Sequence, residues 1–252
     1  MLRTRVIPCL LLKGRGLVKT VKFANPKYVG DPMNAVKIFN EKEVDELMLL
    51  DITASEEGRG PSFAVIEEIA EECFMPMAYG GGITSMDDIR RILQLGVEKV
   101  VLNRAALEQP GLVTQASKEF GAQAVVVSID VKRKLLGGHQ VVGQRGRQAT
   151  GRDPVKFALE AQALGAGEIL LNSVDRDGTM DGMDLKLVRE VAASLSVPLV
   201  AVGGVGSLEH IVQARDAGAS AIAAGSFFVF QGPHRAVLIS YPEYKELTEA
   251  LA

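Results

Sequence analysis

The sequence has few of the residues that build disulfide scaffolds and metal centres. It contains two cysteines, Cys9 and Cys73, three histidines and no tryptophan among 252 residues. Two cysteines far apart in a chain of this length predict buried free thiols in a reducing compartment, so we expect a cytoplasmic protein. The histidines, His139, His210 and His234, lack the spacing of metal ligands. We therefore expect no metal site and no bound cofactor.

Long apolar runs and a strong charge imbalance are also missing. No stretch reaches the roughly 18 apolar residues that a membrane helix needs, and the apolar run near the N-terminus is too short for a signal peptide. The formal net charge is −3, which argues against nucleic acid or an anionic membrane as the main partner. Hydrophobic residues make up 47% of the chain, enough for the core of one large domain or two small ones.

Short aliphatic runs alternate with amphipathic segments along the whole chain. Segments such as 85–96 and 207–218 begin at a serine followed by acidic residues and end at a glycine, as helices commonly do. Strands that each precede a helix, over about 250 residues, predict a single (β/α)8 TIM barrel of the α/β class. The expected strands are 5–11, 46–52, 76–79, 98–102, 124–130, 168–172, 199–202 and 221–224.

The sequence repeats itself with an offset of 122 residues, the difference between Pro76 and Pro198. PMAYGGGITS, from residue 76, aligns with PLVAVGGVGS, from residue 198, and DELMLLD, from residue 45, aligns with GEILLNS, from residue 167. Two half-barrels are therefore expected, at about 1–122 and 123–252. A doubly wound sheet, the alternative for alternating strands and helices, gives no reason for this duplication.

In each half a pair of glycines closes the third strand and leads into a helix that begins at a serine. Glycine lets backbone N–H groups approach an anion closely, and a helix N-terminus attracts negative charge. The glycines either serve only to make tight turns or bind phosphates. Their symmetric placement favours a ligand with a phosphate at each end. The pairs are Gly81 with Gly82 and Gly203 with Gly204.

Four expected strands begin with a charged residue where an apolar one is usual. Two basic and two acidic side chains that face inward can neutralise one another, whereas a lone buried ion is costly. The residues alone leave two interpretations, a structural plug at the bottom of the barrel or a gate. These residues are Arg5, Glu46, Lys99 and Glu168.

Several motifs spread over the chain are typical of one family. They include RVIPCL at 5–10, GGGI at 80–83, GAQAVVVSID at 121–130, DRDGT at 175–179 and GGVGSLEH at 203–210. With these motifs the chain resembles the cyclase (synthase) subunit of imidazole glycerol phosphate synthase, from residue 3 to about 228. The resemblance implies that a separate class I glutaminase subunit docks under the N-terminal face. Ammonia then passes through the barrel core to a bis-phosphate ribonucleotide.

The same resemblance implies roles for particular residues. Asp130 and Asp177 would lie in the active site, and the four charged strand starts would form the ammonia gate. Phosphate anchoring would fall to Gly82, Asn103, Gly178, Gly204, Gly225 and Ser226.

One position departs from the family at the end of the first strand. The family uses two aspartates, one closing strand one and one closing strand five, and Asp130 is the second of these. Alignment of the strand ends places Leu11 opposite Asp130, with an offset of 119 residues and thus a small gap relative to 122. Leucine cannot transfer a proton. Leu10 and Leu12 are interpreted as ordinary core, and further departures near the same mouth are Arg104, Asn172 and Val202.

This pattern is similar to paralogues found with bacterial surface-polysaccharide genes, such as those for lipopolysaccharide. That resemblance implies a barrel subunit and a glutaminase that supply ammonia to a third protein, which amidates an acetamido sugar. Three hypotheses follow: such an ammonia-using subunit, a true cyclase of histidine biosynthesis in which other groups replace the lost aspartate, and a non-catalytic ammonia conduit that activates its glutaminase.

Loops around the expected mouth carry further candidates. Lys19, after the first strand, either closes over a substrate phosphate or is a solvated loop residue. Asp51 orients Lys19, hydrates the cavity or caps the next turn. The segment 132–152 predicts a β-hairpin-like flap over an anionic ligand. Basic residues around it are Lys132, Arg133, Lys134, Arg145, Arg147 and Arg152.

Overall fold

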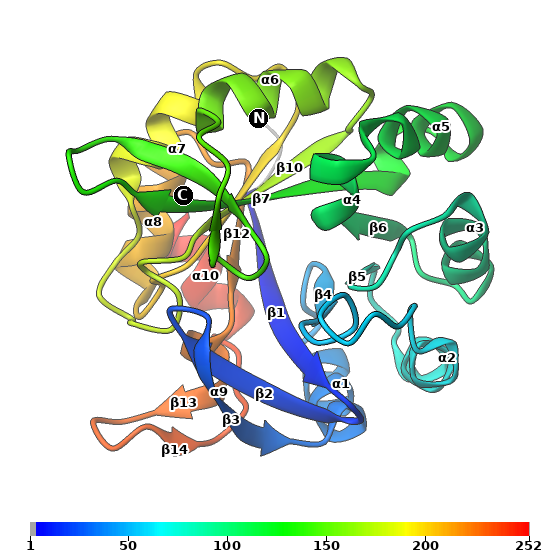
Figure 1. Ribbon diagram of the computed structural model, residues 1–252. Coiled ribbons are helices and arrows are strands. Elements are labelled where there is room, and N and C mark those ends of the chain that lie inside the picture. Colours follow the sequence, from blue (N-terminus) through cyan, green and yellow to red (C-terminus); the bar gives the residue numbers. More distant parts are fainter. Residues whose placement is uncertain (1–3, 252) are drawn as a thin grey trace.

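The computed structural model describes residues 4–251 and contains a closed barrel of parallel strands (Figure 1). Each strand pairs in parallel with the next around the barrel, and β12 returns to pair with β1. The predicted (β/α)8 barrel is confirmed, with every expected strand in place. The barrel strands are β1 (Arg5–Lys13), β4 (Leu47–Asp51), β5 (Met77–Gly80), β6 (Lys99–Leu102), β7 (Val125–Arg133), β10 (Glu168–Ser173), β11 (Leu199–Val202) and β12 (Ala221–Ala224).

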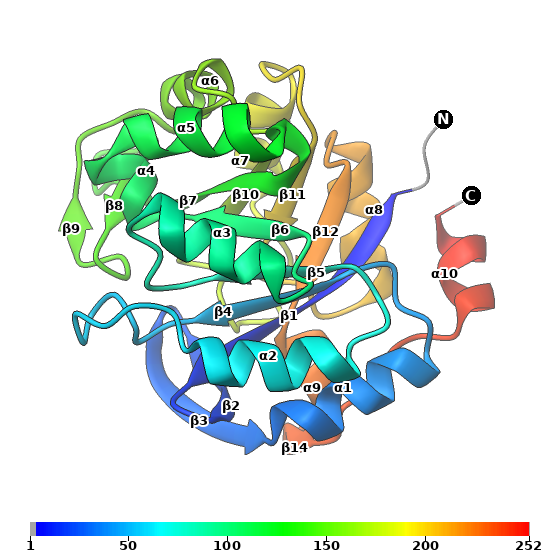
Figure 2. The same ribbon diagram turned by 90° about the vertical axis from the view of Figure 1, so that its right-hand side faces the viewer.

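Helices surround the outside of the barrel (Figures 1 and 2). Ser85 begins one of them with a capping box, in which its side chain and that of Asp88 satisfy each other's backbone N–H groups. No helix within residues 4–251 is long and apolar enough to span a bilayer. The helices are α1 (Pro32–Glu41), α2 (Phe63–Glu72), α3 (Met86–Gln94), α4 (Arg104–Glu108), α5 (Pro110–Phe120), the 3-10 turn Ala122–Ala124, α6 (Pro154–Ala163), α7 (Leu185–Ala192), α8 (Leu208–Asp216), α9 (Ser226–Val229) and α10 (Tyr244–Ala250).

The apolar core has two compartments, because successive side chains of a strand point to opposite faces. On β1, Ile7 and Cys9 belong to the cluster inside the barrel, together with residues such as Met48. Leu10 and Leu12 belong to the cluster between the barrel and the helices and are at most 1% exposed. Their interpretation as ordinary core is confirmed.

Short antiparallel strands extend the barrel at its carboxyl ends. After β1 the chain forms β2 (Gly16–Val21) and β3 (Ala24–Gly30), and after β7 it forms β8 (His139–Gly143) and β9 (Gln148–Ala149). These segments, and the loop between β4 and α2, lie on the side of the barrel opposite the start of β1 (Figure 2). The hairpin-like form of segment 132–152 is confirmed, whereas the β2–β3 ribbon was not predicted. A further hairpin, β13 (Phe230–Gln231) with β14 (Ala236–Val237), follows α9.

Strand register gives an independent measure of the internal repeat. Leu11 pairs with Leu50, and Asp130 pairs with Asn172. Since Leu50 and Asn172 are 122 residues apart, Leu11 is the counterpart of Asp130. The pairing agrees with the strand-end alignment of the sequence. The boundary between the two expected half-barrels, near residue 122, remains a prediction.

Candidate active site

A cavity of about 360 Å³ opens at the carboxyl ends of the barrel strands, where barrels of this architecture carry their active sites. The structure brings every expected catalytic and phosphate-binding residue to its wall. Their roles in binding and catalysis remain predictions. These wall residues are Leu11, Lys19, Gly81, Gly82, Asn103, Asp130, Asp177, Gly178, Gly203, Gly204, Gly225 and Ser226.

Asp130, near the carboxyl end of β7, is a carboxyl group buried in this cavity, and only 7% of it is exposed. Asn103 Nδ2 donates a hydrogen bond to Asp130 Oδ2 at 3.2 Å. Burial raises the pKa of Asp130 to about 7, although hydrogen bonds from Asn103 and Asn172 favour its charged form. A carboxyl group that titrates near neutrality is suited to give and take protons at physiological pH.

The two opposite walls of the cavity differ in polarity. On the wall formed by β7 and β10, Ser128, Asp130 and Asn172 point to the cavity. At the corresponding places on β1 and β4 stand Cys9, Leu11 and Leu50, which pack with the apolar cluster inside the barrel. Burial raises the pKa of the Cys9 thiol to about 11, so this thiol stays protonated and is a poor nucleophile. The cavity therefore has one wall with groups that are able to transfer protons and one wall without such groups.

Asp177 is held in place by the β2–β3 ribbon. Its Oδ2 accepts hydrogen bonds from Thr20 Oγ1 at 2.7 Å and from the backbone N–H of Phe23 at 3.0 Å. From the other side, Arg235 donates to the backbone oxygens of Gly178 at 3.1 Å and of Thr179, and it belongs to the β13–β14 hairpin. Two hairpins thus fix the loop that carries Asp177 at the mouth of the barrel.

Gly178→Ala is expected to destabilise the chain by about 2–4 kcal/mol, more than a positive φ alone explains. Gly178 has φ +68°, and a Cβ there would lie 2.1 Å from the backbone oxygen of Thr20. Thermal unfolding checks this, with Gly58→Ala as the matched control, because Gly58 has φ +65° and open space around it. The control is expected to cost about 1 kcal/mol. Equal losses in the two variants would contradict the close packing at Gly178.

Lys19 does not occupy a loop, and the expectation of a solvated loop lysine is wrong. It lies in β2 and is 7% exposed, and its Nζ donates to the backbone oxygen of Cys9 at 2.8 Å. Burial lowers the pKa of Lys19. A Cβ at Gly225 would lie 1.7 Å from Lys19 Nζ, so the ammonium group rests against the loop of the second half. This places Lys19 beside the expected phosphate position at Ser226.

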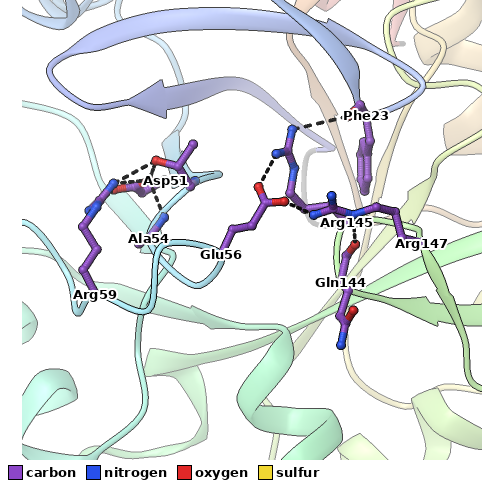
Figure 3. Close-up of polar contacts among 9 residues, drawn as sticks. Phe23, Asp51, Ala54, Glu56, Arg59, Gln144, Arg145 and Arg147 are labelled. Carbon is purple, nitrogen blue, oxygen red and sulfur yellow. Dashed lines mark hydrogen bonds and ion pairs between the residues drawn. The ribbon is translucent and has the colours of Figure 1, made fainter.

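Asp51 caps the turn that follows β4, as one of its interpretations predicted. Its Oδ1 accepts hydrogen bonds from the backbone N–H groups of Thr53 at 3.0 Å and Ala54 at 3.1 Å. Its Oδ2 lies 2.9 Å from Arg59 Nη1 (Figure 3). The contacts of Lys19 are instead with Cys9, so the structure does not support Asp51 as the residue that orients Lys19.

The paired glycines are required by packing whether or not they bind an anion. A Cβ at Gly81 would lie 2.3 Å from the backbone oxygen of Asp51, and one at Gly204 would lie 2.2 Å from that of Gly182. Both positions also have a positive φ, +119° and +100°. The tight-turn interpretation therefore has a steric basis here, and phosphate binding remains a prediction that the cavity position supports.

At the amino ends of the strands, the four charged residues form a closed ring. Lys99 Nζ lies 2.8 Å from Glu46 Oε2 and 3.2 Å from Glu168 Oε2, and Arg5 pairs with both carboxylates. Glu46 and Glu168 are only 2% and 5% exposed. Burial lowers the pKa of Arg5, but hydrogen bonds and charge from Glu168 and Glu46 leave it raised. The ring balances its charges, and its role as a gate remains a prediction.

Two of the three histidines, His139 and His210, have partners outside the cavity. His139 Nε2 lies 3.1 Å from Asp184 Oδ2, and His210 Nδ1 accepts a hydrogen bond from the backbone N–H of Gly206. Within residues 4–251, no three His, Cys, Asp or Glu side chains gather in a way that could hold a metal ion.

Sequence analysis missed one acidic residue of the cavity, Glu56, in the loop between β4 and α2. Its carboxylate lies between Arg145 and Arg147 of the β8–β9 turn (Figure 3). Arg145 and Arg147 lie 89 and 91 positions after Glu56 in the chain. No local sequence pattern predicts a contact between residues so far apart in the chain, although both arginines were expected near the flap.

Fold and site together define a (β/α)8 barrel of the kind found in enzymes, with a cavity at the carboxyl ends of its strands that has one polar wall and one apolar wall. The chain belongs to the family described as histidine biosynthesis protein, whose model matches residues 5–234. It is 52% identical to the "Putative imidazole glycerol phosphate synthase subunit hisF2" of Pseudomonas aeruginosa, over 98% of this chain and 99% of that protein. The barrel is thus HisF-like.

Two further relatives cover nearly the whole chain. The "Putative imidazole glycerol phosphate synthase subunit hisF3" of Vibrio vulnificus is 50% identical over 100% of this chain and 97% of its own length. The "Imidazole glycerol phosphate synthase subunit HisF" of Exiguobacterium sibiricum is 44% identical over 99% of this chain and 98% of its own length.

Proposed function

We propose that this chain is the ammonia-accepting barrel subunit of a glutamine amidotransferase, and that its acceptor differs from the ribonucleotide of histidine biosynthesis. The observation that carries the proposal is the position of Leu11. Strand register makes it the counterpart of Asp130, so one of the two positions at which the family has an aspartate is apolar, in a cavity whose wall keeps the expected phosphate-binding residues. A reaction that needs both carboxylates is thereby disfavoured.

The two ends of the barrel support the ammonia route. The ring of Arg5, Glu46, Lys99 and Glu168 closes one end, and the cavity with Asp130 lies at the other. Small apolar side chains such as Ala78, Ala221 and Ala223 are among those inside the barrel between them. Such an interior suits neutral ammonia and disfavours ammonium, because an unpaired ion is costly to bury. The proposed source is a class I glutaminase subunit docked on the N-terminal face, which gives a heterodimer.

The proposed acceptor is a phosphorylated small molecule, in a pathway that amidates an acetamido sugar of a surface glycan. Three features support this role: the apolar wall at Leu11, the similarity to paralogues with polysaccharide genes, and the identities to relatives. Those named hisF2 and hisF3 are 52% and 50% identical to this chain, whereas the HisF of Exiguobacterium sibiricum is 44% identical. A third protein that carries the sugar would complete the system.

A second candidate is the cyclase of histidine biosynthesis itself. It is favoured by the presence of Asp130, whose pKa is raised by burial to about 7, and by Asp177 in its fixed loop. In this case Asp130 alone would serve as acid and base in turn. A third candidate, the non-catalytic conduit that activates its glutaminase, needs the ring but not the carboxyl group of Asp130.

One assay separates the cyclase from the other two candidates. The purified chain is mixed with the bis-phosphate ribonucleotide and a high concentration of ammonium salt at alkaline pH, and imidazole glycerol phosphate is measured. We expect no turnover by the unaltered chain. Robust turnover would overturn both the altered acceptor and the conduit.

Leu11→Asp is expected to produce measurable imidazole glycerol phosphate in the same assay, because it restores a carboxyl group opposite Asp130. General acid–base groups contribute about 10²–10⁴-fold in rate, so the gain is at least about a hundredfold over background. Leu11→Asn is the matched control, since it adds polarity without an ionisable group. Equal results for the Asp and Asn variants would show that the lost carboxylate alone does not silence the cyclase.

A further inference from the structure

Two arginines at the mouth of the cavity, Arg145 and Arg147, share a single acidic partner. Arg104, Arg145 and Arg147 all line the cavity there, and Glu56 is the carboxylate that contacts two of them. Arg104 pairs with Glu108 on its own helix at 2.8 Å. The guanidinium groups come from two different elements and converge on one side of the mouth.

Glu56 uses both of its carboxylate oxygens in this contact. Oε2 accepts from Arg145 Nη1 at 2.5 Å, and Oε1 accepts from Arg147 Nη2 (Figure 3). Arg145 also donates to the backbone oxygen of Phe23 at 3.3 Å, in the ribbon that holds Asp177. Two guanidinium groups that donate hydrogen bonds to one anionic group are a common arrangement for phosphate recognition.

Ser55, the residue before Glu56, accepts a hydrogen bond from the neighbouring glycine loop, as Glu56 does from the flap. Ser55 Oγ accepts a hydrogen bond from the backbone N–H of Gly82 at 3.3 Å. The backbone oxygen of Ser55 accepts one from Arg104 Nη1 at 3.2 Å. The Gly82 N–H is one of the donors expected to face a phosphate. A single dipeptide therefore takes up donors from both the glycine loop and the flap.

The second half of the barrel lacks this carboxylate. By the offset of 122 residues, Glu56 corresponds to Gly178, which has no side chain. The loops agree with that offset, because Gly82 approaches Gly60 and Ala54 while Gly204 approaches Gly182 and Arg176. At this position the carboxylate side chain is thus present in one of the two corresponding loops and absent from the other.

We infer that Arg145, Arg147 and the Gly82 N–H form a subsite for one phosphate group of the acceptor, and that Ser55 and Glu56 are its internal competitor. This inference rests on the proposed phosphorylated acceptor. A phosphate monoester carries a charge of about −1.5 to −2 at pH 7 against −1 for a carboxylate, so it balances two guanidinium groups better. Binding would exchange Glu56 for the phosphate and draw the flap onto the ligand. The subsite therefore selects for a doubly charged group.

The test uses inorganic phosphate as the probe and the backbone amide signals of Gly82 and Gly204 as separate reporters in nuclear magnetic resonance. Glu56→Gln removes the competing charge and is expected to lower the phosphate dissociation constant at Gly82 about 5–20-fold, the range for loss of a charge-assisted contact. Arg147→Gln is expected to raise it about tenfold. The value at Gly204 stays within about twofold in both variants, which also reports an intact fold.

Glu57→Gln is the matched control, because Glu57 lies in the same loop and pairs with Arg59 at 2.6 Å instead of with the flap. It is expected to leave phosphate binding at Gly82 unchanged. An equal effect of Glu57→Gln and Glu56→Gln would mean a general charge effect and would overturn the inference. So would a Gly82 signal that responds to phosphate in none of the variants. If Gly204 still responds in that case, the phosphorylated acceptor survives; if neither glycine responds, the proposed acceptor fails as well.

Discussion

Replacing Glu46 by Leu is expected to lower the free energy of unfolding by about 3–5 kcal/mol, the range for breaking a buried ion pair. Glu46 is 2% exposed and pairs with both Arg5 and Lys99. Its loss leaves two cations to share Glu168 in a confined space, so one positive charge has no counterion. Urea unfolding followed by circular dichroism measures the effect, since the chain has no tryptophan to serve as a fluorescent probe.

The matched control removes one charge of each sign. Glu46→Leu combined with Lys99→Met leaves the Arg5–Glu168 pair, and it is expected to recover most of the lost stability, because an apolar replacement of a buried pair is often neutral. A single variant that loses less than about 1 kcal/mol, or a double variant no more stable than the single one, would show that the ring is not a mutually compensating set.

The double variant also separates a plug from a gate. If the ring passes ammonia from a docked glutaminase, opening it changes product formed with glutamine as the ammonia source and spares product formed with added ammonium. If the ring is only a plug, the two reactions change together. Stability and coupling are thus read from the same protein; the stability result needs no acceptor, whereas both product measurements use the acceptor.

The barrel and the position of Leu11 were predictable from the sequence for a common reason. Both depend on periodic patterns that run along the chain, the alternation of strand and helix and the offset of 122 residues. Register then follows, since a shift of one residue would turn every side chain to the other face of the strand. The charged strand starts, Arg5 and Lys99 with Glu46 and Glu168, stood out against an apolar pattern in the same way.

The β2–β3 ribbon escaped prediction because its turn uses residues that rarely signal one. Lys22 and Phe23 have φ values of +52° and +62°, in the region that favours glycine or asparagine. Most of β3 is also exposed, so it lacks the alternating burial that marks a strand. Lys19 was therefore placed in a loop, when it belongs to a buried strand. Glu56 escaped for a different reason, since contacts between distant loops leave no local pattern.

Asp130→Asn is expected to stabilise the chain above pH 7 and to leave its stability little changed below about pH 4. Burial raises the pKa of Asp130 to about 7 in the folded chain, against about 3.9 in the unfolded chain. The stability that protonated Asp130 supports is fully present below about pH 4 and is lost as pH rises to about 7. About three pKa units correspond to at most about 4 kcal/mol. Asparagine does not ionise, so the variant avoids this loss.

Urea unfolding at several pH values between 4 and 8.5 measures the difference between the variant and the unaltered chain. The gain should grow from about pH 4 to about pH 7 and then level off. Asp216→Asn is the control, because the Asp216 side chain is 60% exposed and should show no comparable gain. Curves that remain parallel at every pH would mean that Asp130 ionises freely in the folded chain.

The same substitution is expected to act in the opposite direction on ammonia transfer, which should fall about 10²–10⁴-fold if Asp130 moves the proton. A residue that only supported the fold would lose stability and activity together. A buried carboxyl group lowers stability at neutral pH. If stability were its only role, asparagine or leucine would serve better at this position. Leu11 shows this replacement at the matching position of the other half. The pairing of a more stable protein with a slower one would therefore identify Asp130 as the proton-transfer group that remains in this barrel.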